Sequence, residues 1–423
     1  MADMCVRPYW ELAFDSGGDV DPAARDALVA GVARENLTDL VVFAHGWNND
    51  RPRATRLYDR FFAPFPDLLR AADGVRVGYA GVIWPSMHFA DEPVPDFPDR
   101  AAATAPGPPA LDVRTRRALV DVLLCEEAVA DRLAELLDGR SEDPARLAEF
   151  VALARGLMDT GGREPDTDPP LLLTGDARVV CEDFTAALAQ VGVVPPELFG
   201  GGLKKLWHGA HELLRQASYY TMKRRAGTVG REGLGPVLGR LAGASPAPRV
   251  HLAGHSFGAR LVAYALRGLP EGAGRVASLT LLQGAFSQFA FASRLPFDRK
   301  RGGALGGLQR RVDGPVVCCH SRRDTALGVL YPLASRVARD DDSLLGVDRS
   351  RWGAIGYEGM RAVDGCAALS LGQAMDGGLP ATGCANVDAS DVVRRGEPPS
   401  GAHSDICHRE LARLILLAGR IVR

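Results

Sequence analysis

The sequence predicts an α/β fold in which a mostly parallel central sheet carries helices on both of its faces. Short apolar segments of β type alternate with helical patterns along most of the chain, and this alternation is typical of βαβ units. The segment 40–44, LVVFA, is apolar at every position, as expected for a parallel strand buried on both faces. A third observation is the pair of glycines at 254 and 258, which predicts a tight turn directly after an apolar run.

Seven short apolar runs are predicted to be strands, and they lie at residues 9–14, 40–44, 75–84, 249–253, 278–282, 316–319 and, more weakly, 386–389. Asp21 followed by Pro22 predicts the start of a helix that runs to about residue 34, since aspartate caps helices and proline suits their first turn. Further helices are predicted at residues 113–137, after Asp143-Pro144, at 182–190 and at 411–418.

The composition is that of an ordinary globular protein, with 46% hydrophobic and 24% charged residues in a chain of 423. The 50 basic and 52 acidic residues nearly balance, so there is no electrostatic reason to expect a nucleic-acid partner. We see no apolar stretch long enough to cross a bilayer and no pattern typical of a signal peptide. We therefore expect a cytoplasmic protein without an integral membrane segment.

The eight cysteines are scattered and include no Cys-x-x-Cys pair, which argues against a zinc or thioredoxin-like site. Cys318 and Cys319 are adjacent in a predicted strand and should point to opposite faces of the sheet. We expect buried, reduced thiols. His208 and His211 lie three residues apart on a predicted helix but have no evident third ligand, so we expect no metal and no other cofactor.

Residues 87–202 differ in character from the rest of the chain. Prolines crowd residues 93–109, which predicts an extended surface segment, and helical patterns follow up to the three glycines at 200–202. We interpret this stretch as a helical insertion within a single domain spanning residues 1–423. It would be either a cap over the active site or a structural appendage.

The sequence Gly254-His255-Ser256-Phe257-Gly258 matches the pattern G-x-S-x-G. It directly follows a predicted strand and precedes a helical pattern, which is the context that gives this motif its meaning. A serine on such a tight turn presents its Oγ at the carboxyl end of the sheet. Glycines two residues to either side remove the Cβ atoms that would clash where the strand and the helix nearly touch.

With this motif in its context, the chain resembles the α/β-hydrolase superfamily of lipases and esterases, from His45 to His403 apart from the insertion. The resemblance implies the α/β-hydrolase fold and Ser256 as the nucleophile. It also implies an oxyanion hole formed by the N–H groups of Phe257 and of Trp47, with Gly46 allowing a close approach of the loop. His45 would orient this loop. The alternative is that His45 and Trp47 are core residues at a strand end.

The resembled family has the chain order serine, acid, histidine, and His320, His403 and His408 remain after Ser256. His403 lies in a polar loop after the last predicted strand, and Gly401 and Ala402 before it would let that loop pack closely. We therefore favour His403 as the general base. His408 falls on the following helix and should make a structural contact, and His320 should belong to a strand end.

The acid should follow the predicted strand 316–319, and Asp324 lies a few residues beyond its end. The alternative is a surface aspartate paired with Arg322 or Arg323. Asp405 is disfavoured because it is too near His403 in sequence.

These residues together predict hydrolysis of an ester of a small molecule or lipid through an acyl-enzyme on Ser256, without a cofactor. A thioester or an amide could be cleaved by the same groups, which would make the protein a thioesterase, an amidase or a peptidase. A different class is a non-catalytic binding module that retains the fold.

Overall fold

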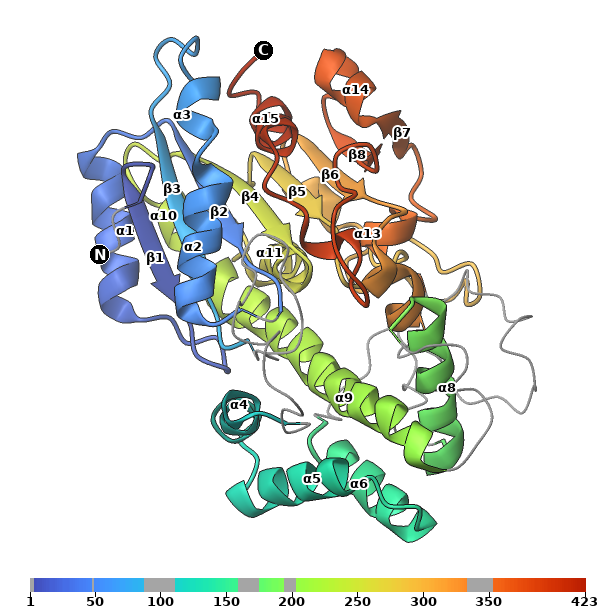
Figure 1. Ribbon diagram of the computed structural model, residues 1–423. Helices are drawn as coiled ribbons and strands as arrows, with labels where there is room; N and C mark the ends of the chain where they lie inside the picture. The colour runs from blue at the N-terminus through green and yellow to red at the C-terminus, as the bar shows by residue number, and fades with distance from the viewer. Residues whose placement is uncertain (1–3, 48, 87–110, 159–174, 194–202, 333–352) are drawn as a thin grey trace.

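The computed structural model describes residues 4–47, 49–86, 111–158, 175–193, 203–332 and 353–423. Their strands form one eight-stranded sheet in the order β1-β3-β2-β4-β5-β6-β8-β7, and every pairing in it is parallel (Figure 1). The strands are β1 (Tyr9–Ala13), β2 (Asp39–Ala44), β3 (Val77–Ile83), β4 (Arg249–His255), β5 (Ser278–Leu282), β6 (Pro315–His320), β7 (Ala367–Ser370) and β8 (Gly383–Asp388).

All seven predicted strands are present, with ends that differ from the predicted ends by no more than a few residues. β7 was not predicted from the sequence. It has only four residues, AALS, none of them fully buried, and it pairs with β8 alone at the edge of the sheet. An edge strand of this kind lacks the apolar run on which the prediction of strands depends.

Helices cover both faces of the sheet, as predicted. One face is covered by α1 (Pro22–Arg34), α9 (Leu206–Thr228), α10 (Gly235–Ala242) and α11 (Phe257–Gly268), and the other by α2 (Arg51–Phe62), α3 (Phe65–Leu68) and α15 (Arg409–Ala418). Cys318 contributes to the core on the first face and Cys319 to the core on the second, as their alternation along a strand requires. All eight cysteines are free.

The helix predicted at residues 113–137 is in fact two helices, α4 (Val113–Leu123) and α5 (Glu127–Gly139). Leu124 adopts a left-handed conformation with φ 57°, and its N–H caps α4 on the carbonyl of Leu119. This conformation reverses the backbone and ends the helix even though the apolar pattern continues beyond it.

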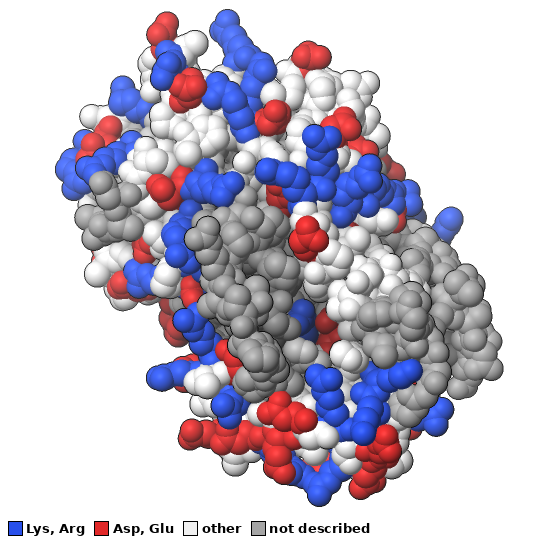
Figure 2. All heavy atoms as spheres, viewed as in Figure 1, with Lys and Arg blue, Asp and Glu red and all other residues white. Residues whose placement is uncertain are grey.

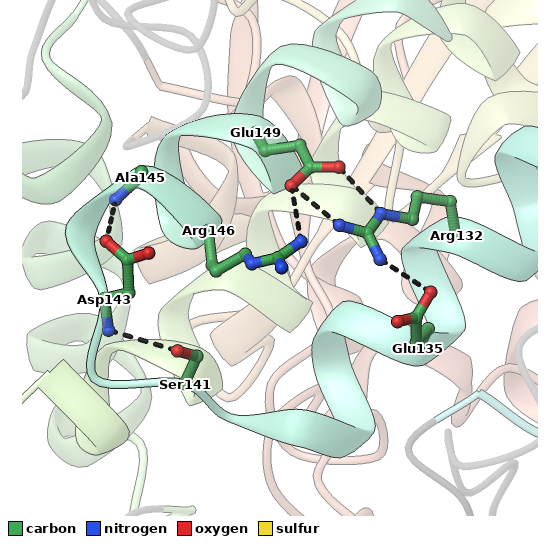
Figure 3. Close-up of polar contacts among 7 residues, drawn as sticks. All are labelled: Arg132, Glu135, Ser141, Asp143, Ala145, Arg146 and Glu149. Carbon is green, nitrogen blue, oxygen red and sulfur yellow. Dashed lines mark hydrogen bonds and ion pairs between the residues drawn. The ribbon is translucent and has the colours of Figure 1, made fainter.

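Two further helices follow in the predicted insertion, α6 (Pro144–Gly156) and α8 (Ala177–Gln190), and α9 runs away from the sheet toward them (Figure 1). Asp143 caps α6 as predicted, with its Oδ1 accepting the N–H of Ala145 at 2.9 Å. Arg132 of α5 binds Glu149 of α6 through two hydrogen bonds of 2.7 and 2.9 Å (Figure 3). Residues 87–110, 159–174 and 194–202 lie outside the described residues, and the assignment of 87–202 as one insertion within a single domain stays a prediction.

Basic and acidic side chains are interspersed over the face shown in Figure 2, in keeping with the balanced net charge. Within the described ranges, none of the helices combines the length and the apolar composition that crossing a membrane requires. Because all the strands are parallel, their carboxyl ends meet at one edge of the sheet, and the segments that follow β2, β4, β6 and β8 gather there.

Candidate active site

Ser256 occupies a strained turn between β4 and α11. Its φ is 56° and its ψ is −118°, a conformation that a residue with a side chain rarely adopts. A Cβ on Gly254 would overlap the carbonyl oxygen of Gly258, and a Cβ on Gly258 would overlap that of Ala44. The two glycines of the motif are therefore required by close backbone contacts, as the sequence predicted.

The structure brings Ser256, His403 and Asp324 together. Nε2 of His403 lies 2.8 Å from Oγ of Ser256, and Nδ1 of His403 lies 2.7 Å from Oδ2 of Asp324. The Asp324 side chain is fully buried, Ser256 is 3% exposed and the His403 side chain is 13% exposed. In this arrangement the Asp324 carboxylate holds the proton of a neutral His403 on Nδ1, which leaves Nε2 free to accept the hydroxyl proton.

Arg322, one of the two arginines that could have paired with Asp324, is engaged elsewhere. Arg322 binds Glu358 at 3.0 Å, while the buried carboxylate of Asp324 also accepts the N–H of Leu327 at 3.0 Å. Asp324 is thus no surface ion-pair partner. His408 binds Asp405 at 2.9 Å and makes the structural contact expected of it.

The loop that carries His403 is fastened to the loop that carries Asp324. The N–H of Ala402 donates to the carbonyl of Arg323 at 3.0 Å, and Asp324 and Gly401 form an isolated antiparallel bridge. Gly401 has a φ of 58°, and a Cβ there would come within 2.6 Å of Thr325 Oγ1. This confirms that glycine lets the loop pack closely.

His255 makes a contact that the sequence did not predict. Its Nε2 lies 2.8 Å from the carbonyl oxygen of His403, and the two ring centroids are 4.9 Å apart. Burial lowers the pKa of His255 to about 3, so the ring is neutral at pH 7 and its Nε2–H donates to His403. His255 is therefore a positioning residue for His403 as well as part of the serine turn.

The loop after β2 lies directly against the serine turn. A Cβ on Gly46 would come within 2.8 Å of the Ser256 Cβ, so only glycine allows this approach. The carbonyl of His45 accepts the Trp84 indole N–H at 3.0 Å, and the two rings stack. Burial lowers the pKa of His45 to about 4, and its Nδ1 donates to the carbonyl of Gly46 at 2.8 Å. His45 thus orients the loop, as predicted from the sequence.

Tyr219 of α9 lies between the two residues predicted to donate to an oxyanion. Its ring centroid is 4.4 Å from that of Phe257 and 5.3 Å from that of Trp47. The sequence offered no signal for this position, because α9 is distant along the chain from both residues. Tyr219 therefore packs against the side chains of both residues.

Gln283, which directly follows β5, is a second residue close to the serine turn. It follows Leu282, whose carbonyl accepts the N–H of Ser256 at 3.0 Å. Its φ is 42°, its side chain is fully buried, and neither atom of its amide has a hydrogen-bond partner among the described residues. A buried amide without a hydrogen-bond partner is energetically costly.

No family model, curated protein or solved structure matches the chain. The geometry of the site is therefore the basis on which a function can be proposed. In the part of the chain that the structure describes, no group of three or more His, Cys, Asp or Glu side chains is placed to hold a metal ion.

Proposed function

We propose that this protein is a serine hydrolase of the α/β-hydrolase type that cleaves a carboxylic ester of a small molecule or lipid. The observation that carries the proposal is the chain of hydrogen bonds from Ser256 Oγ through His403 to the buried carboxylate of Asp324. A nucleophile, a base and an orienting acid in this order are the minimum needed for acyl transfer to a serine hydroxyl.

The position of the loop after β2 also supports the proposal. β2 is the direct neighbour of β4 in the sheet, so residues 45–47 lie beside the serine turn. The nucleophile turns of α/β-hydrolases are paired with an oxyanion loop that follows another strand of the sheet. The neighbouring positions of β2 and β4 in the sheet support an arrangement of this kind.

The reaction would proceed in two steps. His403 Nε2 takes the proton of Ser256 as Oγ attacks the ester carbonyl, and the N–H groups of Trp47 and Phe257 stabilise the oxyanion that forms. His403⁺ then gives its proton to the departing alkoxide, which leaves as an alcohol. In the second step His403 takes a proton from water, the hydroxide attacks the acyl-enzyme, and the carboxylic acid departs as Ser256 recovers its proton.

A serine variant and a matched pair of histidine variants test the proposal. A fluorophosphonate probe should label Ser256 of the wild type, and p-nitrophenyl esters should be hydrolysed. Both activities should be lost in Ser256→Ala and His403→Gln and retained in His408→Gln, which disrupts the neighbouring but separate pair of His408 and Asp405. A wild type that neither reacts with the probe nor turns over esters would favour the binding module. Labelling without ester turnover would favour a thioester or an amide substrate.

We also propose a cytoplasmic location. The eight free cysteines support it, because thiols persist in reducing compartments. Burial raises the pKa of the Cys319 thiol to about 12, which keeps it protonated and unreactive. A fluorescent fusion of the full chain, followed by cell fractionation, would test this.

A further inference from the structure

A cavity of about 800 Å³ lies beside α11, on the side that faces the end of α9 and the segment between β5 and β6. Its lining includes five arginines: Arg224 from α9, Arg231 from the π-helix Val229–Leu234, Arg260 and Arg267 from α11, and Arg310 from the 3₁₀-helix Leu308–Arg311. Neither Ser256, His403 nor Asp324 lines this cavity, so it is separate from the candidate active site.

Arg260 is held in place at the cavity wall. It is 2% exposed, its Nε donates to the carbonyl of Lys223 at 2.7 Å, and its guanidinium lies 4.0 Å from the centroid of the Tyr264 ring. Arg267 lies seven residues further along α11, and its guanidinium is 5.8 Å from the centroid of the same ring. Tyr264 therefore gathers two cations by cation–π interaction and limits the conformations that they sample.

Glycines form much of the remaining wall. A Cβ on Gly227 would come within 3.1 Å of Arg260 Nη2, so the absence of a side chain there leaves room for the guanidinium. Gly302, Gly303, Gly306 and Gly307 line the cavity from the segment that follows β5. With no side chains to fill the space, this wall presents backbone, and the arginines supply most of the polar side chains.

The charge of the lining is one-sided. No aspartate or glutamate is among the described residues that line the cavity. Arg231 binds Glu232 at 2.6 Å, but Glu232 is not part of the lining. Cations that converge from four elements repel one another, and a bound anion relieves that repulsion. The volume is typical of sites that hold a small molecule.

We propose that this cavity is a binding site for a small anion that carries two or more linked phosphoryl groups. Guanidinium groups bind phosphate oxygens in pairs with matched geometry, which is why arginine predominates at such sites. A single carboxylate offers too few acceptor positions for five guanidiniums that come from four elements, whereas linked phosphoryl groups present terminal oxygens in several directions. The proposal is independent of hydrolysis at Ser256.

Calorimetric titration of the full chain with inorganic pyrophosphate tests the proposal. The wild type should bind pyrophosphate with a dissociation constant below about 1 mM near physiological salt. Arg267→Met/Arg310→Met removes two exposed lining arginines and should weaken binding at least roughly tenfold, because each lost charge-assisted hydrogen bond is costly. Arg260 is left intact because its burial makes its replacement a risk to folding.

The matched control is Arg275→Met/Arg299→Met, which removes the same charge from exposed arginines that do not line the cavity. It should bind within about twofold of the wild type, as should Ser256→Ala. Citrate should bind at least roughly tenfold more weakly than pyrophosphate. Absence of pyrophosphate binding, an equal loss in the control, a loss in Ser256→Ala, or citrate binding as tight as that of pyrophosphate would each overturn the proposal. Melting temperatures of all variants establish that they are folded.

Discussion

Replacement of Gly46 by alanine tests whether the loop after β2 has to touch the serine turn. The added Cβ would lie 2.8 Å from the Ser256 Cβ and 3.0 Å from Nδ1 of His255. Carbon atoms in contact are separated by about 3.5–4.0 Å, so one side has to move by about 1 Å. The serine turn is fixed by the contacts of Gly254 and Gly258, and we therefore expect the loop to move and to carry the Trp47 N–H with it.

A misplacement of about 1 Å costs on the order of 100-fold in rate at an active site. Gly46→Ala should therefore slow the labelling of Ser256 by a fluorophosphonate about 100-fold. Overpacking of this kind costs about 1–3 kcal/mol of stability, so the variant should melt earlier but remain folded. The rate constant is measured from the time course of labelling at several probe concentrations.

Gly156→Ala is the matched control, because a Cβ at that position in α6 meets no atom within 4 Å. It should label at the wild-type rate and melt at or above the wild-type temperature. If Gly46→Ala is folded and labels as fast as the wild type, the loop does not take part in the reaction, and the assignment of Trp47 as an oxyanion donor is wrong.

Three further predictions concern single side chains of the site. Asp324→Asn should reduce kcat for a p-nitrophenyl ester by about 10⁴-fold, since an amide favours the wrong tautomer of His403; Asp405→Asn, measured in parallel, should not. The free energy of unfolding should fall as the pH drops from 6.5 toward 3, because the unfolded chain binds a proton that buried His255 does not. His255→Gln should lower this slope by about 1 kcal/mol per pH unit in urea titrations, and an unchanged slope would contradict the burial argument. Gln283→Leu should leave the stability within about 1 kcal/mol of the wild type, and a loss above about 3 kcal/mol would show that the amide is satisfied.

The residues brought together at the site could be predicted because each follows the carboxyl end of a strand. Ser256 follows β4, Asp324 follows β6, and His403 lies in the segment after β8. The carboxyl ends of parallel strands lie at the same edge of the sheet, so the residues that follow them come close together whatever the length of chain between the strands. The roles of catalyst and oxyanion donor derive from the resemblance, and they stay predictions that the experiments above address.

Contacts that depend on side-chain direction could not be predicted. The motif around Ser256 specifies a turn but does not specify that the His255 ring reaches the carbonyl of His403. Tyr219 and the cavity arginines lie on helices. The spacing of polar residues along a helix does not show whether a side chain faces solvent or a pocket. The break at Leu124 was missed because a left-handed residue leaves the apolar pattern on either side intact.

Distant parts of the chain contribute the loop at Gly46, the serine at position 256 and the imidazole at position 403. During synthesis, the hydroxyl emerges from the ribosome well before the ring that would activate it. Until residue 403 has been translated and its loop has docked against Thr325, Ser256 lacks its imidazole neighbour. Under the proposed mechanism, the order of translation would therefore delay the reactivity of Ser256 until all eight strands have been translated.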